Sequence, residues 1–337
     1  MDLAAAVLQG DRLALARLLT AIENEDPAGL RSLSDLYPHG GQADRIGITG
    51  PPGCGKSSLV ARLATHIRRH GLRPGTGPVK VAVVAVDPSS PFSGGAILGD
   101  RIRMRDLAGD SGVFIRSMAS RGALGGLARA SFGTVQALDA AGYPVILIET
   151  VGAGQAEVEI ARAAHTTLVV EAPGMGDDVQ AIKAGILEIA DILVVNKADL
   201  PGAENAIRQL RAALVLGYPS QETGHHAASM QPEPMPTAAP GWVPVVLPAS
   251  ALKDTGIPDV VDAIARHLAQ LDVTGARQAF EQSRALREVE SLLTQRLVEW
   301  FHGQLGGEEL QAAVRSVFQR QISPRQAVDR LTEGLRA

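Results

Sequence analysis

The stretch 45-RIGITGPPGCGKSSL-59 decides the fold, because it joins a short apolar run to a glycine-rich turn and then to the start of a helix. Within it, Gly50, Gly55, Lys56 and Ser57 complete the pattern G-x-x-x-x-G-K-[ST] of a phosphate-binding P-loop. Glycines let backbone N–H groups approach phosphate oxygens, and the positive end of the following helix favours an anion. The stretch therefore predicts a nucleotide-binding α/β protein.

Each part of this loop has an expected role. The lysine of a P-loop reaches the β- and γ-phosphates, so Lys56 is the predicted catalytic cation, and the hydroxyl of Ser57 is a predicted Mg²⁺ ligand. The predicted phosphate-binding residues are Gly50, Pro51, Pro52, Gly53, Cys54, Gly55, Lys56, Ser57 and Ser58.

Short β-branched runs alternate with segments of helical length along the middle of the chain. Several of these runs are apolar on both faces, as buried parallel strands are. Strands are expected at 45–50, 79–87, 112–117, 143–150, 166–172, 191–197 and 243–250, and helices at 56–70, 122–141, 178–190 and 203–215. The pattern predicts an α/β fold with a doubly wound, mainly parallel sheet of the P-loop NTPase type, whose ligands lie beyond the carboxyl ends of the strands.

Three regions are expected along the chain. Residues 1–40 are predicted to be an N-terminal helical extension, 41–275 the P-loop domain and 276–337 a C-terminal helical arm. Residues 218–241 are rich in Pro, Ser and Thr, have no periodicity and indicate a mobile insertion. In the arm, Ser323 followed by Pro324 is typical of a helix start.

Composition excludes several classes of protein. Apolar residues make up 45% of the 337-residue chain and charged residues 20%, which is typical of a soluble globular protein. The net charge of −4 gives no reason to expect a nucleic-acid partner. No apolar run approaches the roughly 20 residues of a membrane span. The single cysteine fits a reducing compartment, and no signal peptide is apparent, so we expect a cytoplasmic protein without a membrane partner.

An acid follows the fourth predicted strand. In nucleotide hydrolases the acid at this position binds the hydration shell of Mg²⁺, and the backbone N–H of a glycine shortly after it contacts the γ-phosphate. The corresponding residues here are Glu149 and Gly152, so the acid is one methylene longer than the aspartate of small GTPases. Gln155 lies three residues beyond the glycine, and for this reason we assign no water-positioning glutamine.

Two further segments predict the choice of base. In Asn196-Lys197-Ala-Asp199 the carboxylate of Asp199 accepts the N1–H and the exocyclic amino group of guanine, a pair of donors that adenine lacks. Lys197 can lie along the purine face. A second base-contacting loop is predicted in 249-ASALKDTGI-257, at Ser250, Ala251 and Leu252. We therefore expect GTP as substrate and GDP as product, in preference to adenine nucleotides.

The chain resembles a known family over nearly its whole length, from about Leu13 to Leu331. The segments that carry the resemblance are VDPSSPFSGGAILGDRIRM (86–104), FIRSMASRGALGGLA (114–128), ETVGAGQAE (149–157), KAGILEIADILVVNKADL (183–200) and SPRQAV (323–328). Together they are similar to the MeaB/ArgK family of P-loop GTPases, chaperones of methylmalonyl-CoA mutase.

This resemblance implies a GTPase of the SIMIBI class that forms a homodimer through its C-terminal helical arm. It also implies a partner, an adenosylcobalamin-dependent acyl-CoA mutase, for which the GTPase gates cofactor delivery and prevents inactivation. Methylmalonyl-CoA, isobutyryl-CoA and hydroxyisobutyryl-CoA mutases all remain open as that partner.

Further site residues follow from the resemblance. Matched residue by residue, the family's Mg²⁺ ligands are Ser57, Asp87, Asp100 and Glu149, and a glutamate at 149 is usual there. The segment 172–183 is similar to the family's switch III loop, in which Asp177, Gln180 and Lys183 would couple the mutase to hydrolysis. Without the resemblance, the acids of this segment indicate the N-terminus of a helix.

The sequence leaves two other functions open. One is an ATP-driven partner of a basic amino-acid transport system, against which Asp199 argues, because that residue predicts guanine. The other is a metallochaperone GTPase that loads nickel into an enzyme, which would require a cluster of Cys or His ligands.

Overall fold

The computed structural model describes residues 2–88, 104, 107, 109–120, 126–150, 155–174, 187–217, 239–304 and 307–333. At Asp87 and Pro88 it describes the backbone alone. The chain divides into two compact units, Met1–Phe280 and Glu281–Ala337.

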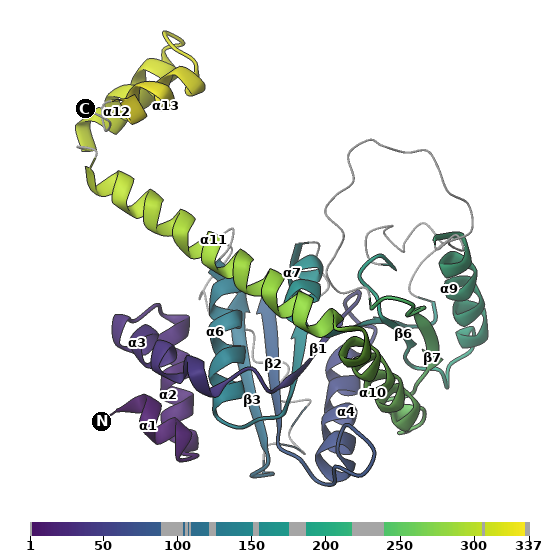
Figure 1. Ribbon diagram of the computed structural model, residues 1–337. Coiled ribbons are helices and arrows are strands. Elements are labelled where there is room, and N and C mark those ends of the chain that lie inside the picture. Colours follow the sequence, from purple (N-terminus) through teal and green to yellow (C-terminus); the bar gives the residue numbers. More distant parts are fainter. Residues whose placement is uncertain are drawn as a thin grey trace. The chain divides into compact units, whose positions relative to one another are not determined.

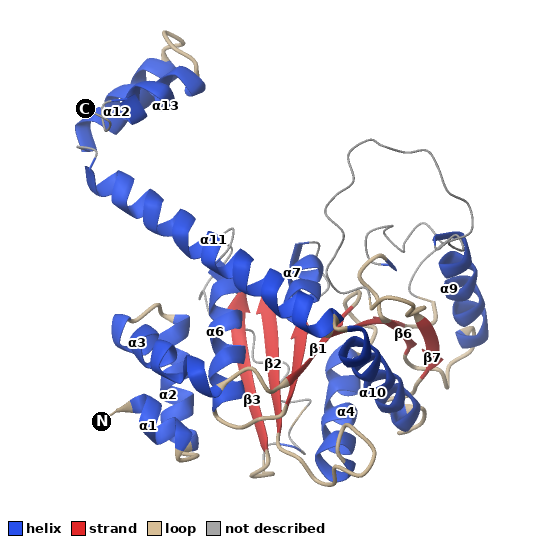
Figure 2. Ribbon diagram, in the orientation of Figure 1, coloured by secondary structure: helices blue, strands red, loops and turns tan. Residues whose placement is uncertain are grey.

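A seven-stranded sheet forms the centre of the first unit (Figures 1 and 2). Its strands are β1 (Asp44–Thr49), β2 (Val81–Pro88), β3 (Val113–Ser120), β4 (Val145–Thr150), β5 (Thr166–Glu171), β6 (Ile192–Val195) and β7 (Val245–Pro248). The spatial order is β3-β2-β4-β1-β5-β6-β7, and every neighbouring pair is parallel. The predicted doubly wound parallel fold is confirmed.

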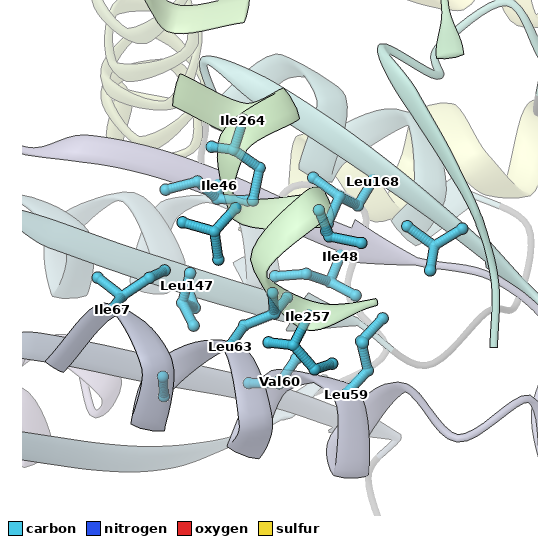
Figure 3. Packing of buried hydrophobic residues seen from close by; sticks show 14 of the residues in the cluster. Ile46, Ile48, Leu59, Val60, Leu63, Ile67, Leu147, Leu168, Ile257 and Ile264 are labelled. Atoms are coloured by element: carbon cyan, nitrogen blue, oxygen red, sulfur yellow. The ribbon is translucent and has the colours of Figure 1, made fainter. Parts of the chain in front are cut away.

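Helices cover both faces of the sheet. On one face, α4 (Lys56–His70) and α10 (Ile257–Thr274) bury Leu59, Leu63 and Ile264 against Ile46 and Ile48 of β1 (Figure 3). The helices of the other face are α6 (Gly126–Ala140), α7 (Gln155–Ala163) and α9 (Ala203–Gly217). The strands β1 and β4 are buried along their whole length, and their central residues are apolar on both faces of the sheet, as burial between two helix layers requires. The helix predicted at 178–190 lies mostly outside the described residues.

The N-terminal extension adds three helices to the layer that contains α6. They are α1 (Leu3–Leu8), α2 (Arg12–Glu23) and α3 (Pro27–Leu36), followed by the single turn η1 (Tyr37–His39). Each of the three helices begins after an aspartate whose side chain accepts backbone N–H groups of the first turn, at Asp2, Asp11 and Asp26. Leu18, Leu19 and Ile22 of α2 join the core that α6 shares with β2 and β4.

The remaining helices are α11 (Ala276–Gln304), α12 (Gly307–Phe318) and α13 (Pro324–Glu333). The boundary between the two units falls within α11. At the predicted start of α13, the N–H of Gln326 donates to Ser323 Oγ at 3.2 Å and the N–H of Ser323 donates to Gln326 Oε1 at 2.9 Å. This reciprocal cap ends the preceding turn and begins the helix at Pro324. None of the helices among the described residues has both the length and the apolar character needed to cross a lipid bilayer.

Candidate nucleotide-binding site

The predicted site residues follow the carboxyl ends of neighbouring strands. The strand β1 ends at Thr49 and is followed by the P-loop, and β4, its neighbour, ends at Glu149 and Thr150. Asn196 follows β6, and Ser250 follows β7. Because all these strands are parallel, their carboxyl ends lie along one edge of the sheet, and residues far apart in the sequence meet there.

Two glycines of the P-loop occupy positions that no side chain could share. Gly50 has φ +142°, and a Cβ atom on it would lie 2.1 Å from the carbonyl oxygen of Val170. Gly55 has φ +91°, and a Cβ atom there would lie 2.5 Å from Asn196 Nδ2. The P-loop therefore lies directly against β5 on one side and against the end of β6 on the other.

Lys56 is buried at the start of α4, with 6% of its surface exposed. Its Nζ donates to the carbonyl oxygens of Gly50, at 2.8 Å, and Pro51, at 2.9 Å. These acceptors hold the ammonium group over the turn of the P-loop. A charge fixed in this way stabilises negative charge on a phosphate without rearrangement of the side chain.

Ser57 and Glu149 form a pair of oxygen ligands. The hydroxyl of Ser57 donates to Glu149 Oε1 at 2.7 Å, and both residues are buried. Thr150 beside them donates to the hydroxyl of Thr49 at 3.2 Å. A hydroxyl and a carboxylate are hard oxygen donors, so these residues fit the ligand preference of Mg²⁺.

Of the other two predicted metal ligands, Asp87 and Asp100, the structure describes only the backbone of Asp87. Asp87 lies near the end of β2, one residue beyond Val86, which pairs with Thr150 of β4. Its backbone is therefore at the same edge of the sheet as Glu149. The side chain of Asp87 and the whole of Asp100 lie outside the described residues.

Asp199 is held by a residue of the second base-contacting loop. Ser250 Oγ donates to Asp199 Oδ1 at 2.5 Å, and the N–H of Lys253 donates to the same Ser250 oxygen at 3.2 Å. The hydrogen bond from Ser250 lowers the pKa of the Asp199 carboxyl below its ordinary value. The carboxylate is therefore ionised at neutral pH, as acceptance of two guanine donors requires.

Asn196 and Lys197 connect this region to the P-loop. Asn196 Nδ2 donates to the carbonyls of Cys54, at 2.8 Å, and Gly55, at 3.3 Å, while its Oδ1 accepts the N–H of Ala251 at 3.1 Å. Lys197, in the left-handed region at φ +57°, donates from Nζ to the Gly53 carbonyl at 2.8 Å. The segments 50–57, 196–199 and 250–252 thus form one continuous site.

The other predicted P-loop residues differ in exposure. Cys54 is fully buried, and burial raises the pKa of its thiol. Pro52, Gly53 and Ser58 are exposed. Leu252 is 80% exposed, beside the base-reading residues. Gly152, Asp177, Gln180 and Lys183, predicted to contact phosphate or to couple hydrolysis to the partner, lie outside the described residues.

Sequence reasoning missed specific partners within the site. It placed Asn196 in the base motif without predicting its bonds to Cys54, Gly55 and Ala251. It also missed Arg62, whose Nε donates to the Ala251 carbonyl at 3.0 Å. Arg62 belongs to no recognised motif, and the only feature of the sequence that could indicate its role is its position on the helix that begins in the P-loop.

A P-loop on a parallel sheet, a buried acid at the end of the adjacent strand and an NKxD segment paired with a second loop define a P-loop GTPase. Comparison with known proteins specifies the family. The family profile for methylmalonyl-CoA mutase-associated GTPase MeaB matches residues 15–305. The chain belongs to this family of GTPases.

Individual relatives agree with this assignment. The chain is 40% identical to a protein of Pyrococcus abyssi described as a GTPase, over 97% of this chain and 94% of that one. It is 30% identical to the mitochondrial methylmalonic aciduria type A homolog of Mus musculus, over 87% of this chain and 66% of that one. A crystal structure of a LAO/AO transport system kinase superposes with a TM-score of 0.69 and 26% identity, over 99% of this chain and 97% of that one.

Proposed function

We propose that this GTPase is a G-protein chaperone of an adenosylcobalamin-dependent acyl-CoA mutase, methylmalonyl-CoA mutase or a close relative. In this role it gates loading of the cofactor and protects the mutase from inactivation. The observation that carries the proposal is the family match across residues 15–305. The similarity to the mouse methylmalonic aciduria type A homolog supports the same class of partner. We place this activity in the cytoplasm, which the single cysteine of the chain favours.

In the proposed site each group has a distinct task. Lys56 and the P-loop N–H groups stabilise charge on the phosphates, and Asp199 reads the base. The hydrogen bond between Ser57 and Glu149 supports a Mg²⁺ site made by Ser57, Asp87, Asp100 and Glu149. Bound there, Mg²⁺ would neutralise charge on the β- and γ-phosphates. Gly152 is proposed to contact the γ-phosphate, and Asp177, Gln180 and Lys183 to link hydrolysis to the mutase.

The proposal includes a homodimer formed through the C-terminal helical arm of residues 276–337. An apolar stripe along α11 supports it, since an exposed stripe of this kind is typical of helix pairing. Its members recur every three or four residues and are each more than half exposed, at Leu286, Val289, Leu293, Leu297 and Trp300.

The test is direct binding to a mutase and its effect on turnover. We expect GTP hydrolysis to change several-fold when methylmalonyl-CoA, isobutyryl-CoA or hydroxyisobutyryl-CoA mutase is added, and a complex to appear in size-exclusion chromatography. The Lys56→Ala variant, assayed with the same mutase, controls for contaminating hydrolases. If all three mutases leave the rate unchanged and form no complex, the proposed partner class is wrong.

A second function has one observation in its favour, the description of the superposed crystal structure as a transport system kinase. A kinase of that kind would use ATP. The pairing of Asp199 with Ser250 supports guanine recognition instead. Competition against a fluorescent GDP analogue separates the two functions: we expect GTP to displace the analogue and ATP to fail at a hundredfold higher concentration.

A further inference from the structure

Arg62 connects the helix of the P-loop to the loop that follows β7. It lies six residues after Lys56 on α4, and its Nε donates to the carbonyl oxygen of Ala251 at 3.0 Å. The same guanidinium lies 3.9 Å from a carboxylate oxygen of Asp254. The Arg62 side chain is 42% exposed and that of Asp254 63%, so this ion pair is weak and the bond to the Ala251 carbonyl is the specific contact.

Ala251 is held on both sides. Its N–H donates to Asn196 Oδ1 at 3.1 Å, while its carbonyl accepts the bond from Arg62. The carbonyl of Ala251 and the N–H of Leu252 belong to one peptide group, which is trans. In a trans peptide these two groups point in opposite directions. By holding the carbonyl against α4, Arg62 therefore turns the N–H of Leu252 away from that helix.

This N–H is an available donor. In the part of the chain that the structure describes, the Leu252 N–H donates to no other group. The neighbouring donors of the loop are already engaged, since the N–H groups of Ser250, Ala251 and Lys253 bond to Thr255, Asn196 and Ser250 respectively.

Asp199 accepts from the two donors of guanine, but it cannot donate to the acceptor on the same edge of the base. The carboxylate accepts from N1–H and from the 2-amino group, and the remaining group on that edge of the base is the 6-oxo oxygen, an acceptor. Leu252 is two residues beyond Ser250, whose Oγ bonds to Asp199, so the Leu252 N–H belongs to the same loop that holds the base-reading carboxylate. It is a donor of the kind that the 6-oxo group requires.

The helix that carries Arg62 provides a rigid support. Leu59, Val60 and Leu63 of α4 belong to the same buried cluster as Ile257, the first residue of α10, and Figure 3 shows these side chains gathered around Ile257. The loop 250–256 is thus anchored where it enters α10. Protein interiors are close-packed and move little, so the hydrogen bond from Arg62 can fix one orientation of the peptide between Ala251 and Leu252.

We propose that Arg62 is a positioning residue for base recognition: it orients the peptide between Ala251 and Leu252 so that the Leu252 N–H donates to the 6-oxo group of guanine. The inference rests on the proposed assignment of residues 250–252 to base recognition. Arg62 itself does not touch the nucleotide in this account.

The experiment compares each variant with wild type for three nucleotides that differ on the base edge. GDP has both the 6-oxo and the 2-amino group, inosine diphosphate lacks the 2-amino group, and 2-aminopurine riboside diphosphate keeps the 2-amino group but lacks both the 6-oxo group and the N1–H. Each is titrated against a fluorescent GDP analogue bound to wild type, Arg62→Ala, Arg62→Lys and Arg69→Ala. Arg69 is the matched control, since it is an exposed arginine on the same helix.

We expect Arg62→Ala to weaken GDP and inosine diphosphate about five- to tenfold, the value of one net hydrogen bond, and 2-aminopurine riboside diphosphate less than twofold. Arg62→Lys should recover part of the loss, because an ammonium group can donate to the same carbonyl. Arg69→Ala should match wild type. Circular dichroism checks that each variant is folded.

Two results would overturn the inference. Equal losses for all three nucleotides would show that Arg62 supports the fold of the pocket without acting on the 6-oxo group. Unchanged affinities would show that the Leu252 peptide is oriented without it. Failure of the base-recognition assignment would look different: wild type, titrated with ADP as a fourth nucleotide, would then bind ADP as tightly as GDP.

Discussion

Lys56 carries a positive charge in a position where almost none of its surface meets solvent, and two P-loop carbonyls fix its ammonium group. Glu149, also buried, is fixed by the hydroxyl of Ser57. Such groups are aligned before a substrate arrives, and alignment in advance is the main source of electrostatic catalysis.

Lys56→Ala should abolish GTP hydrolysis, since the phosphate charge then loses its fixed cation. We expect the turnover number to fall at least about a hundredfold, as for loss of other aligned donors in active sites. Phosphate release under saturating GTP measures it. Lys80→Ala, an exposed lysine just before β2, is the control and should hydrolyse GTP at the wild-type rate. Full activity of Lys56→Ala would contradict the catalytic assignment.

Asp199→Asn should relax the choice of base, because an amide cannot accept from both guanine donors. We expect the preference for GDP over inosine diphosphate to fall at least about tenfold. In wild type, the lowered pKa of Asp199 means that the carboxylate stays ionised as the pH falls, until the pH drops below the ordinary range of an aspartate. The ratio of GDP affinity to inosine diphosphate affinity, in which titration of the shared terminal phosphate cancels, should therefore be flat between pH 8 and about pH 5. A decline of this ratio centred near pH 6 would indicate that another group of the protein controls recognition of the 2-amino group.

Between elements, the linker from η1 to β1 depends on one carboxylate at the end of α6. Asp139 accepts the backbone N–H groups of Gly41, at 2.7 Å, Gln42, at 3.2 Å, and Ala43, at 3.0 Å. These bonds tie the N-terminal helices to the point at which β1 begins. The strand then leads directly into the P-loop, so the anchor helps to set where the phosphate-binding turn starts.

Asp139→Ala should lower the free energy of unfolding by about 2 kcal/mol, since three backbone donors lose a charged acceptor. Urea denaturation followed by circular dichroism measures the change. The control is Asp35→Ala, because Asp35 is an exposed aspartate on α3. A change below about 0.5 kcal/mol would show that water replaces the carboxylate without loss.

The seven strands could be predicted from sequence, because burial on both faces gives each of them an apolar run. The residues at which the strands begin and end could be predicted less accurately. The run 191–197 was predicted as strand, whereas β6 ends at Val195, since Lys197 adopts a positive φ that a strand does not allow. The run 243–250 shortens to Val245–Pro248 in β7. Pro244 has no N–H to donate to a ladder, which accounts for the later start.

For the site, the motifs were predictable and the bonds between them were not. The P-loop and the two base-reading segments have local spacings that sequence reveals. The bond from Asn196 to Cys54 spans 142 residues and the bond from Arg62 to Ala251 spans 189. Contacts over such separations depend on strand order, and a single sequence carries no local signal of them.

At the scale of the whole molecule, the apolar stripe of α11 predicts a homodimer, and this prediction can be tested by substitution. Replacing Leu293, at its centre, by Asp should convert the proposed dimer to a monomer, because a buried unpaired carboxylate opposes helix pairing. Light scattering after size-exclusion chromatography measures the mass. Ser291→Asp is the control, since residue 291 lies on the opposite side of the helix by its 3.6-residue period. A wild-type monomer would contradict the dimer proposal outright.

The single amide of Asn196 has a consequence for how the ligand is recognised. Its nitrogen bonds to the P-loop and its oxygen to the loop of residues 250–252. One side chain therefore connects the segment that binds the phosphates to the segment that binds the base. Any effect of one half of the nucleotide on the affinity of the other must be reciprocal, and we expect it to be favourable, because a bound phosphate chain would fix the loop that holds Asn196. Guanosine should bind more tightly when inorganic tripolyphosphate is present, and calorimetric titration of the nucleoside with and without that anion would measure this cooperativity between fragments.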